Sequence, residues 1–243
     1  MSDLSSQTHA ARDVWNDGDD EMYRRDQSHW RGVGRWRNDG RWQSIGKQTL
    51  QGFDLMHRYL SIPMSIVGTR RNILEWGPGG GTNLFALAPI ASKYYGVDVS
   101  TSNLEECTRM IEGEGHNNVF CPILVQDSPA EVSAQVADEI DLFVSTAVFQ
   151  HFPSKAYGES VLRVLYSITS PKALGIIQIR YDNNNPKYRP IESLDEYKER
   201  HITANSYMLD EFHDLANSAG FDVLFIKSIN SNVNYATFHL RRK

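Results

Sequence analysis

The segment 73–81 joins an apolar run to a turn that is rich in glycine. It reads Ile-Leu-Glu-Trp-Gly-Pro-Gly-Gly-Gly, with Glu75 ahead of the turn. Its alternating glycines are Gly77, Gly79 and Gly81. Without a Cβ, such a backbone can lie against a bound molecule, and a helix starting near Thr82 would direct free N–H groups to the same place. A dinucleotide-binding turn, G-x-G-x-x-G, would require glycine where Thr82 stands. The alternative is a tight turn that binds no ligand.

A carboxylate follows this turn at the spacing used for ribose recognition. Asp98 lies 21 residues after Gly77, in the segment Tyr-Gly-Val-Asp-Val-Ser that ends a predicted strand. An acid at this offset can accept hydrogen bonds from both ribose hydroxyls of a nucleotide. The alternative is that Asp98 or Ser100 caps the next helix. The pairing with the glycine turn favours the ribose role, with Val99 as a neighbouring cofactor contact.

A histidine follows the end of the fourth predicted strand. His151 lies in the segment 145–153, which reads Ser-Thr-Ala-Val-Phe-Gln-His-Phe-Pro. A neutral imidazole at this place could take the proton of an acceptor hydroxyl, so we predict His151 as the general base. Alternatively, it is a structural residue that orders the loop before Pro153. Gln150 would orient the acceptor or pack.

The residues at the end of the fifth predicted strand could line the same cleft. Tyr181 and Asp182 are further catalytic candidates, and Arg180 is a candidate substrate contact. The polar insertion 181–206 is predicted to form a lid, because loops of this length usually carry function. Within the insertion, His201 is a candidate substrate contact and a second candidate base.

Tryptophans and arginines are interleaved before the glycine turn. Residues 21–50 hold seven Arg or Lys residues and three acidic ones, together with Trp30, Trp36 and Trp42. Trp faces stack on sugars or cations, and Arg binds carboxylates and phosphates, so Trp30 and Arg31 are predicted substrate contacts. Alternatively, the tryptophans dock N-terminal helices onto the core. Stacking on single-stranded nucleic acid would use similar residues.

The composition restricts the class of protein. The chain has 243 residues, 40% of them hydrophobic, and a formal charge of −5, which disfavours a general nucleic-acid binder. Cys107 and Cys121 are too few for a disulfide framework or a zinc site and fit a reducing compartment. We expect a cytoplasmic protein, because neither a signal peptide nor a membrane-spanning stretch is visible. No metal is predicted, although Asp127 and Asp182 could contribute to a divalent site.

From residue 72 onward, short apolar runs alternate with helical patterns. This alternation is typical of a parallel sheet flanked by helices. The predicted strands are 72–76, 93–99, 119–125, 140–145 and 173–180, followed by a helix at 207–218 and strands at 221–229 and 232–241. Ser231-Asn232 between the last two strands predicts a hairpin. The expected fold is α/β: a Rossmann-like, doubly wound, mostly parallel sheet of seven strands with a C-terminal antiparallel hairpin.

Composition also divides the chain into three parts. Residues 1–20 carry one basic and five acidic side chains and are predicted to be a flexible end. Residues 21–68 are predicted to form an aromatic-basic helical cap or lid over the site. Residues 69–243 form the cofactor-binding domain, which includes the lid insertion 181–206.

With the glycine turn, Asp98 and the final hairpin, the chain resembles class I S-adenosylmethionine-dependent methyltransferases over roughly residues 70–240. It is most similar in character to bacterial enzymes that methylate sugar, polysaccharide or small-molecule hydroxyls. The resemblance implies S-adenosylmethionine as cofactor and S-adenosylhomocysteine as product. It implies that Asp127, with Ser128 beside it, accepts a hydrogen bond from the adenine amino group. It also implies that Ser145 flanks the sulfonium, although Asp127 and Ser128 could instead cap a helix.

Several functions fit this scaffold. The leading hypothesis is O-methylation of a sugar or another small molecule. An N-methyltransferase or an RNA methyltransferase is the second hypothesis, although the Asn/Asp-Pro-Pro-Tyr type of sequence that amino-methylating nucleic-acid enzymes carry is absent after the fourth strand. A cofactor-binding partner subunit without catalysis is the third, and a homodimer is open.

Overall fold

The computed structural model describes residues 3–16, 40–61, 70–116 and 118–243, in which seven strands form one sheet. The strand order is β3-β2-β1-β4-β5-β7-β6. The strands are β1 (Arg71–Trp76), β2 (Ala91–Asp98), β3 (Phe120–Leu124), β4 (Ile140–Ser145), β5 (Thr169–Arg180), β6 (Phe221–Asn230) and β7 (Tyr235–Arg242). The first five strands pair in parallel, and β7 pairs antiparallel with both β5 and β6. This arrangement confirms the predicted fold.

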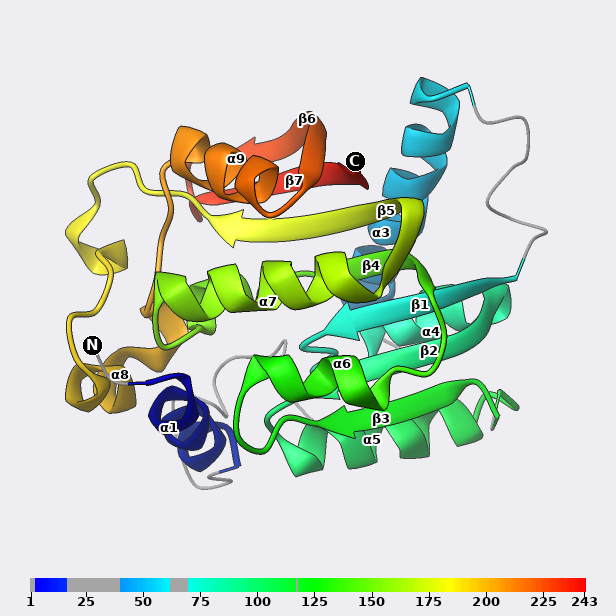
Figure 1. The fold of residues 1–243 in the computed structure, drawn as a ribbon, viewed down its shortest axis with the longest axis horizontal. Coiled ribbons are helices and arrows are strands. Elements are labelled where there is room, and N and C mark those ends of the chain that lie inside the picture. The colour runs from blue at the N-terminus through cyan, green and yellow to red at the C-terminus, as the bar shows by residue number, and fades with distance from the viewer. Residues whose placement is uncertain (1–2, 17–39, 62–69, 117) are drawn as a thin grey trace.

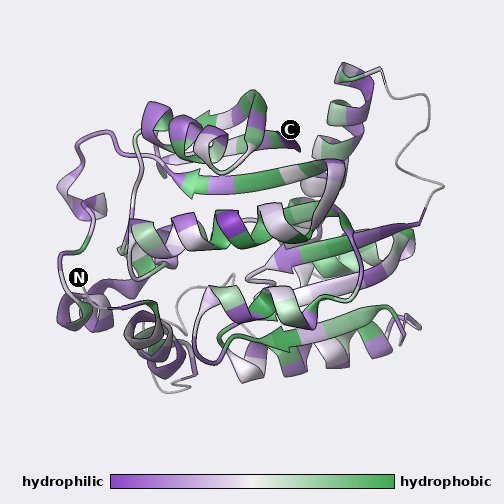
Figure 2. Ribbon diagram, viewed as in Figure 1, coloured by the Kyte–Doolittle hydropathy of each residue, from purple (hydrophilic) through white to green (hydrophobic). Residues whose placement is uncertain are grey.

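Helices cover both faces of the sheet (Figure 1). One face packs against α3 (Gly40–Tyr59), α4 (Thr82–Leu87) and α5 (Thr101–Glu112), and the other against α6 (Val132–Gln135), α7 (Lys155–Ile168) and α9 (Leu209–Ser218). Successive strand residues point to opposite faces, so Ile73 joins the first apolar cluster and Leu74 the second. The hydrophobic strands in Figure 2 lie between these layers because both of their faces are buried.

Parts of β5 and the final hairpin differ from the sequence prediction. β5 begins at Thr169 and not at residue 173, because the residues between form an irregularity in its pairing with β4, where Lys172 adopts a φ of 68°. The hairpin joins its strands through four residues, 231–234. Asn234 in this turn has a φ of 54°, a left-handed conformation that asparagine tolerates better than most residues.

The first described segment is a packed helix, whereas its acidic composition predicted a flexible end. In α1 (Leu4–Asn16), Ala10, Ala11, Val14 and Trp15 are buried. They pack against α8 (Leu194–Arg200) in the insertion 181–206, where Tyr197 is fully buried. The charge composition of this segment did not indicate a packed helix, because packing depends on the apolar residues that gather on one helix face. No helix among the described residues is long and apolar enough to cross a membrane.

Close packing between β4 and β5 requires a glycine at position 175. A Cβ on Gly175 would lie 1.9 Å from the ring of Phe143, which is buried at the centre of the sheet. We expect Gly175→Ala to lower the free energy of unfolding by about 1–3 kcal/mol. Urea denaturation measures this change, and Gly40→Ala is the control because no atom lies within 4 Å of its added Cβ. Equal stability of the two variants would contradict this packing.

Candidate functional site

The glycine turn between β1 and α4 has a conformation that demands glycine. Gly77, Gly79 and Gly81 have φ values of 76°, 52° and 80°. These left-handed values are accessible to glycine but costly for residues that carry a Cβ. A Cβ on Gly77 would also lie 2.4 Å from the side chain of Val148. The turn thus presents bare backbone at the carboxyl end of the sheet.

Asp98 lies at the end of β2, beside this turn. Its carboxylate is buried and accepts hydrogen bonds from the Ser100 backbone N–H at 2.8 Å and the Asn103 side chain at 3.2 Å. Burial raises the pKa of Asp98 to about 6, although its hydrogen bonds oppose that shift. The cap of α5 is Ser100, which accepts from the backbone N–H of Asn103. Backbone N–H groups of Val99 and Gly79 also act on this carboxylate.

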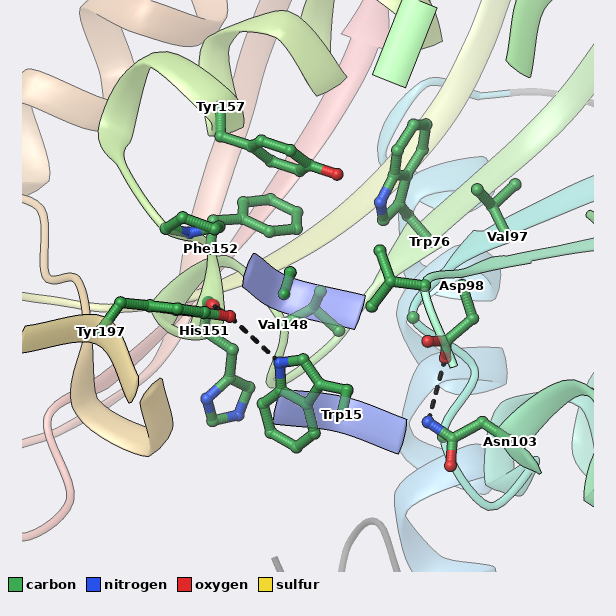
Figure 3. Close-up of a pocket in the computed structure, with 15 residues that line it drawn as sticks. Trp15, Trp76, Val97, Asp98, Asn103, Val148, His151, Phe152, Tyr157 and Tyr197 are labelled. Carbon is green, nitrogen blue, oxygen red and sulfur yellow. Dashed lines mark hydrogen bonds between the residues drawn. The ribbon is translucent and has the colours of Figure 1, made fainter. Parts of the chain in front are cut away.

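One cavity brings several of the predicted residues together (Figure 3). Gly77, Gly79, Asp98 and Val99 line one side of it. The opposite side includes His151 and the apolar or aromatic residues Trp15, Phe152, Tyr157 and Tyr197. We call this space the Asp98 cavity. Its mixture of bare backbone, one carboxylate and aromatic rings suits a nucleoside.

His151 is held rigidly on the wall of the Asp98 cavity. Its Nδ1 lies 3.2 Å from the carbonyl oxygen of His201, and its ring makes an edge contact with Trp15, with centroids 5.1 Å apart. Donation from Nδ1 to that carbonyl leaves Nε2 as the basic nitrogen. The side-chain amide nitrogen of Gln150 lies 3.3 Å from Nε2. In this tautomer the Nε2 lone pair accepts from the Gln150 amide, and a proton taken up at Nε2 would replace that hydrogen bond.

Gln150 and Arg180 converge on a residue that sequence reasoning missed. Both side chains donate to the hydroxyl of Tyr235, from 3.3 Å and 3.1 Å. The Arg180 guanidinium also stacks between the rings of Tyr188 and Tyr235, at 4.4 Å and 5.2 Å from their centroids. Neither Gln150 nor Arg180 lines the Asp98 cavity or a second cavity, described below, that lies beside the same glycine turn.

Glu75 lies behind the glycine turn in a buried hydrogen-bond network. Its carboxylate accepts from the Asn83 amide at 2.7 Å and from the Tyr94 hydroxyl at 2.5 Å. Asn83 also donates to Thr146 at 2.9 Å and accepts from Thr49 at 2.7 Å. Burial raises the pKa of Glu75 to about 7, against the lowering effect of Tyr94 and Asn83. Through Asn83, Glu75 thus helps to fix the positions of Thr146 and Thr49 around the glycine turn.

The remaining predicted cofactor residues lie near the Asp98 cavity but do not line it. Asp127 is exposed and accepts a hydrogen bond of 2.5 Å from Ser5 of α1. Ser128 precedes a short 3₁₀ turn without capping it through its side chain. Ser145 is buried and donates to the backbone oxygen of Trp76 at 3.0 Å.

The remaining predicted acceptor residues that the structure describes do not line the Asp98 cavity either. Tyr181 is half-buried and pairs with Tyr207 through a β-bridge. The Asp182 carboxylate accepts from the Asn184 backbone N–H at 2.7 Å. His201 is buried, and its ring lies edge-on to Trp15. The predicted substrate contacts Trp30 and Arg31 lie outside the described residues. Among the described residues, no group of His, Cys, Asp or Glu could hold a metal ion.

Solved structures with this fold include methyltransferases. Magnesium protoporphyrin IX methyltransferase from Synechocystis PCC 6803, solved with S-adenosylhomocysteine, has a TM-score of 0.62 and 15% identity. The match covers 98% of this chain and 100% of that chain. The cyclase SpnF matches with a TM-score of 0.59 and 12% identity over 85% of each chain. These identities establish the fold alone.

The sequence itself matches a family. Residues 74–174, which hold the glycine turn, Asp98 and His151, match the methyltransferase-domain family. The chain therefore holds a region similar to a methyltransferase domain, within a fold that it shares with solved S-adenosylmethionine-dependent methyltransferases.

Two fungal proteins match part of this chain. Enniatin synthase of Fusarium equiseti and enniatin synthetase of Fusarium oxysporum are each 32% identical to this chain over 110 residues. The match covers 45% of this chain but 4% of either relative. The chain therefore corresponds to a small part of these curated relatives.

A second cavity was not foreseen from the sequence. It lies beside the same glycine turn, between α3 and the sheet, and we call it the α3 cavity. Tyr235, Thr237 and His239 of β7 line it, together with Gln178 of β5. The spacing of two between the β7 residues indicates a shared sheet face. Because β7 reads only as part of a hairpin in the sequence, nothing there connects that face with the glycine turn.

The buried Glu75 makes stability depend on pH. Its pKa rises from 4.5 to about 7, so the folded chain binds this proton more tightly than the unfolded chain. Its contribution to the free energy of unfolding is therefore greatest at low pH, and it falls by roughly 3 kcal/mol as the pH rises through about 7. We expect Glu75→Gln to remove this change. Urea titrations of both proteins at about pH 5 and about pH 8 measure it, and a parent–variant difference independent of pH would contradict the raised pKa.

Proposed function

We propose that this chain transfers the methyl group of S-adenosylmethionine to a hydroxyl of a sugar or another small polar molecule. The observation that carries the proposal is that the glycine turn and the buried Asp98 carboxylate line one cavity. Asp98 would accept hydrogen bonds from the two ribose hydroxyls, and Gly77 and Gly79 would lie against the methionine portion. Asp127 and Ser128 are the candidate contacts at the adenine end, and Ser145 is the candidate near the sulfonium.

The residues fit this cofactor by shape and charge. The rings of Trp15, Trp76 and Tyr157 give the Asp98 cavity apolar walls for the adenosine, and Asn103 helps to fix the carboxylate. A Cβ in the glycine turn would occupy space against Val148, so the turn keeps the backbone accessible. When bound, the cofactor supplies an electrophilic methyl group on a sulfonium.

His151 is the proposed general base. During methyl transfer, Nε2 of His151 would take the proton that the acceptor hydroxyl loses. Support comes from its place on the wall of the Asp98 cavity and from the His201 carbonyl, which favours the tautomer with a basic Nε2. Tyr181 and Asp182 are weaker proposals, because neither side chain lines this cavity.

The other functions remain distinguishable by experiment. SpnF is a cyclase, and folds of this kind host more than one chemistry. N-methylation, RNA methylation or a non-catalytic cofactor-binding role would each give a different product pattern. Screening sugars, small alcohols, amines and RNA with radiolabelled S-adenosylmethionine separates these functions.

The ribose role of Asp98 gives a binding test. We expect Asp98→Asn to bind S-adenosylmethionine about tenfold to a hundredfold more weakly, because charge-assisted hydrogen bonds contribute roughly 1.5–3 kcal/mol. Isothermal titration calorimetry on folded protein measures the affinity. Asp222→Asn is the matched control, because Asp222 pairs with Arg241 at the far edge of the sheet. Parent-like affinity in a folded Asp98→Asn protein would refute the ribose role.

The base role of His151 gives a catalytic test. With an acceptor found in the screen, we expect His151→Ala to lose roughly 10²–10⁴-fold in turnover while retaining cofactor affinity. The exposed His213 on α9 provides the control His213→Ala, whose turnover should match that of the parent. Near-normal turnover of His151→Ala would refute the base role and would indicate that His151 is a structural residue.

A further inference from the structure

The α3 cavity shares one wall with the Asp98 cavity. Gly77 and Gly79 line both, so the two spaces meet at the glycine turn. Beyond the turn, the α3 cavity reaches Thr146 and Ala147, which follow β4. Ala147 has a φ of 58°, an unusual conformation for a residue with a Cβ, and such strain concentrates at functional sites. A molecule in the α3 cavity would thus lie next to the place proposed for the cofactor's sulfonium.

The walls of the α3 cavity are polar but almost uncharged. Amide and hydroxyl side chains line it from several elements: Gln48, Thr49, Gln178, Tyr235 and Thr237. Glu75 and Lys227 are the charged residues among its lining. The Glu75 carboxylate already accepts two hydrogen bonds, and Lys227 is exposed. This lining matches a neutral molecule with several hydroxyl groups better than an anion, which would require arginines or several lysines.

The hydroxyl of Tyr235 in this lining is held by two hydrogen bonds. Its hydroxyl oxygen accepts from the amide of Gln150 and from the guanidinium of Arg180. A hydroxyl oxygen that accepts two hydrogen bonds still has its own proton to donate. The buried Gln150 and Arg180 lie behind Tyr235 and fix its position. Their role toward a ligand would therefore be indirect.

His239 is a second polar group in the α3 cavity, on the same face of β7. The side chain is only 3% exposed, and its ring stacks on Phe225 with centroids 4.4 Å apart. Burial, and then the charge of Lys227, lower the pKa of His239 to about 4, so the imidazole is neutral. Its Nε2 lies 3.2 Å from the position of a Cβ on Gly52, at the surface between α3 and β7. A neutral imidazole carries one donor and one acceptor nitrogen, and on the wall of the α3 cavity it is suited to exchange a hydrogen bond with a ligand hydroxyl.

We infer that the α3 cavity is the acceptor site and that it takes a neutral, polyhydroxylated small molecule, recognised by Tyr235 and His239. This inference rests on the proposed function, because the methyl group must come from a cofactor in the Asp98 cavity. It adds the location of the acceptor and the residues that contact it.

The inference is tested by binding of defined polyols. We would measure saturation-transfer NMR for methyl α-D-glucopyranoside, myo-inositol and glycerol, with and without S-adenosylhomocysteine. The variants are Tyr235→Phe, His239→Gln and Thr237→Val, so that one unfolded variant does not end the test. Tyr166→Phe and His213→Gln are matched controls on exposed residues of α7 and α9.

We expect at least one polyol to bind the parent and both controls, and to bind roughly tenfold more weakly to the folded cavity variants. Affinity for S-adenosylhomocysteine, measured by calorimetry, should stay within about twofold of the parent. Absence of polyol binding, or binding unaffected by the cavity variants, would overturn the inference. Weakened S-adenosylhomocysteine binding in these variants would overturn it too, because the cavity would then hold the amino-acid end of the cofactor. Failure of the parent to bind S-adenosylhomocysteine would instead overturn the proposed function.

Discussion

The carboxylate of Glu75 is buried beneath the glycine turn, and the geometry on both sides of that turn depends on how this charge is accommodated. A buried carboxylate is costly unless donors surround it. Asn83 of α4 and Tyr94 of β2 supply them, and Asn83 extends the network to Thr146 after β4 and to Thr49 of α3. The network as a whole therefore links five parts of the fold, namely β1, β2, α3, α4 and the segment after β4. The turn, the end of β4 and α3 keep their relative positions because this network is satisfied.

Local sequence patterns were sufficient for the sheet and for the placement of the glycine turn beside Asp98. The glycine turn and Asp98 each follow a strand, and parallel strands bring their carboxyl ends to one edge without further information. The final hairpin was likewise visible from its alternation of apolar residues. The α3 cavity, in contrast, depends on tertiary contacts. Tyr235 reaches the site because β7 inserts between β5 and β6, an order that no local pattern encodes.

Two errors of sequence reasoning share a physical cause. Gln150 and Arg180 carry groups that bind substrates in many enzymes, but here they are buried and donate to Tyr235. The residues of α1 were judged by their charges, although the helix buries one face against α8. In both cases the residue type indicated the chemistry of the side chain, whereas its packing partner lies far away in the sequence. Such contacts are inaccessible to a reading of spacing and composition.

The position of Trp15 connects cofactor affinity with the folding of distant segments. Its indole N–H donates to the hydroxyl of Tyr197 at 3.2 Å, and that hydroxyl donates to the carbonyl oxygen of His151 at 2.8 Å. One wall of the Asp98 cavity is therefore complete only when α1 and the insertion 181–206 have docked together. By thermodynamic linkage, any ligand that binds solely to this docked form must stabilise it to the same degree. The population of molecules in which α1 has opened locally would then fall as cofactor occupancy rises. Protection of the α1 backbone amides from hydrogen exchange therefore reports whether the Asp98 cavity is occupied.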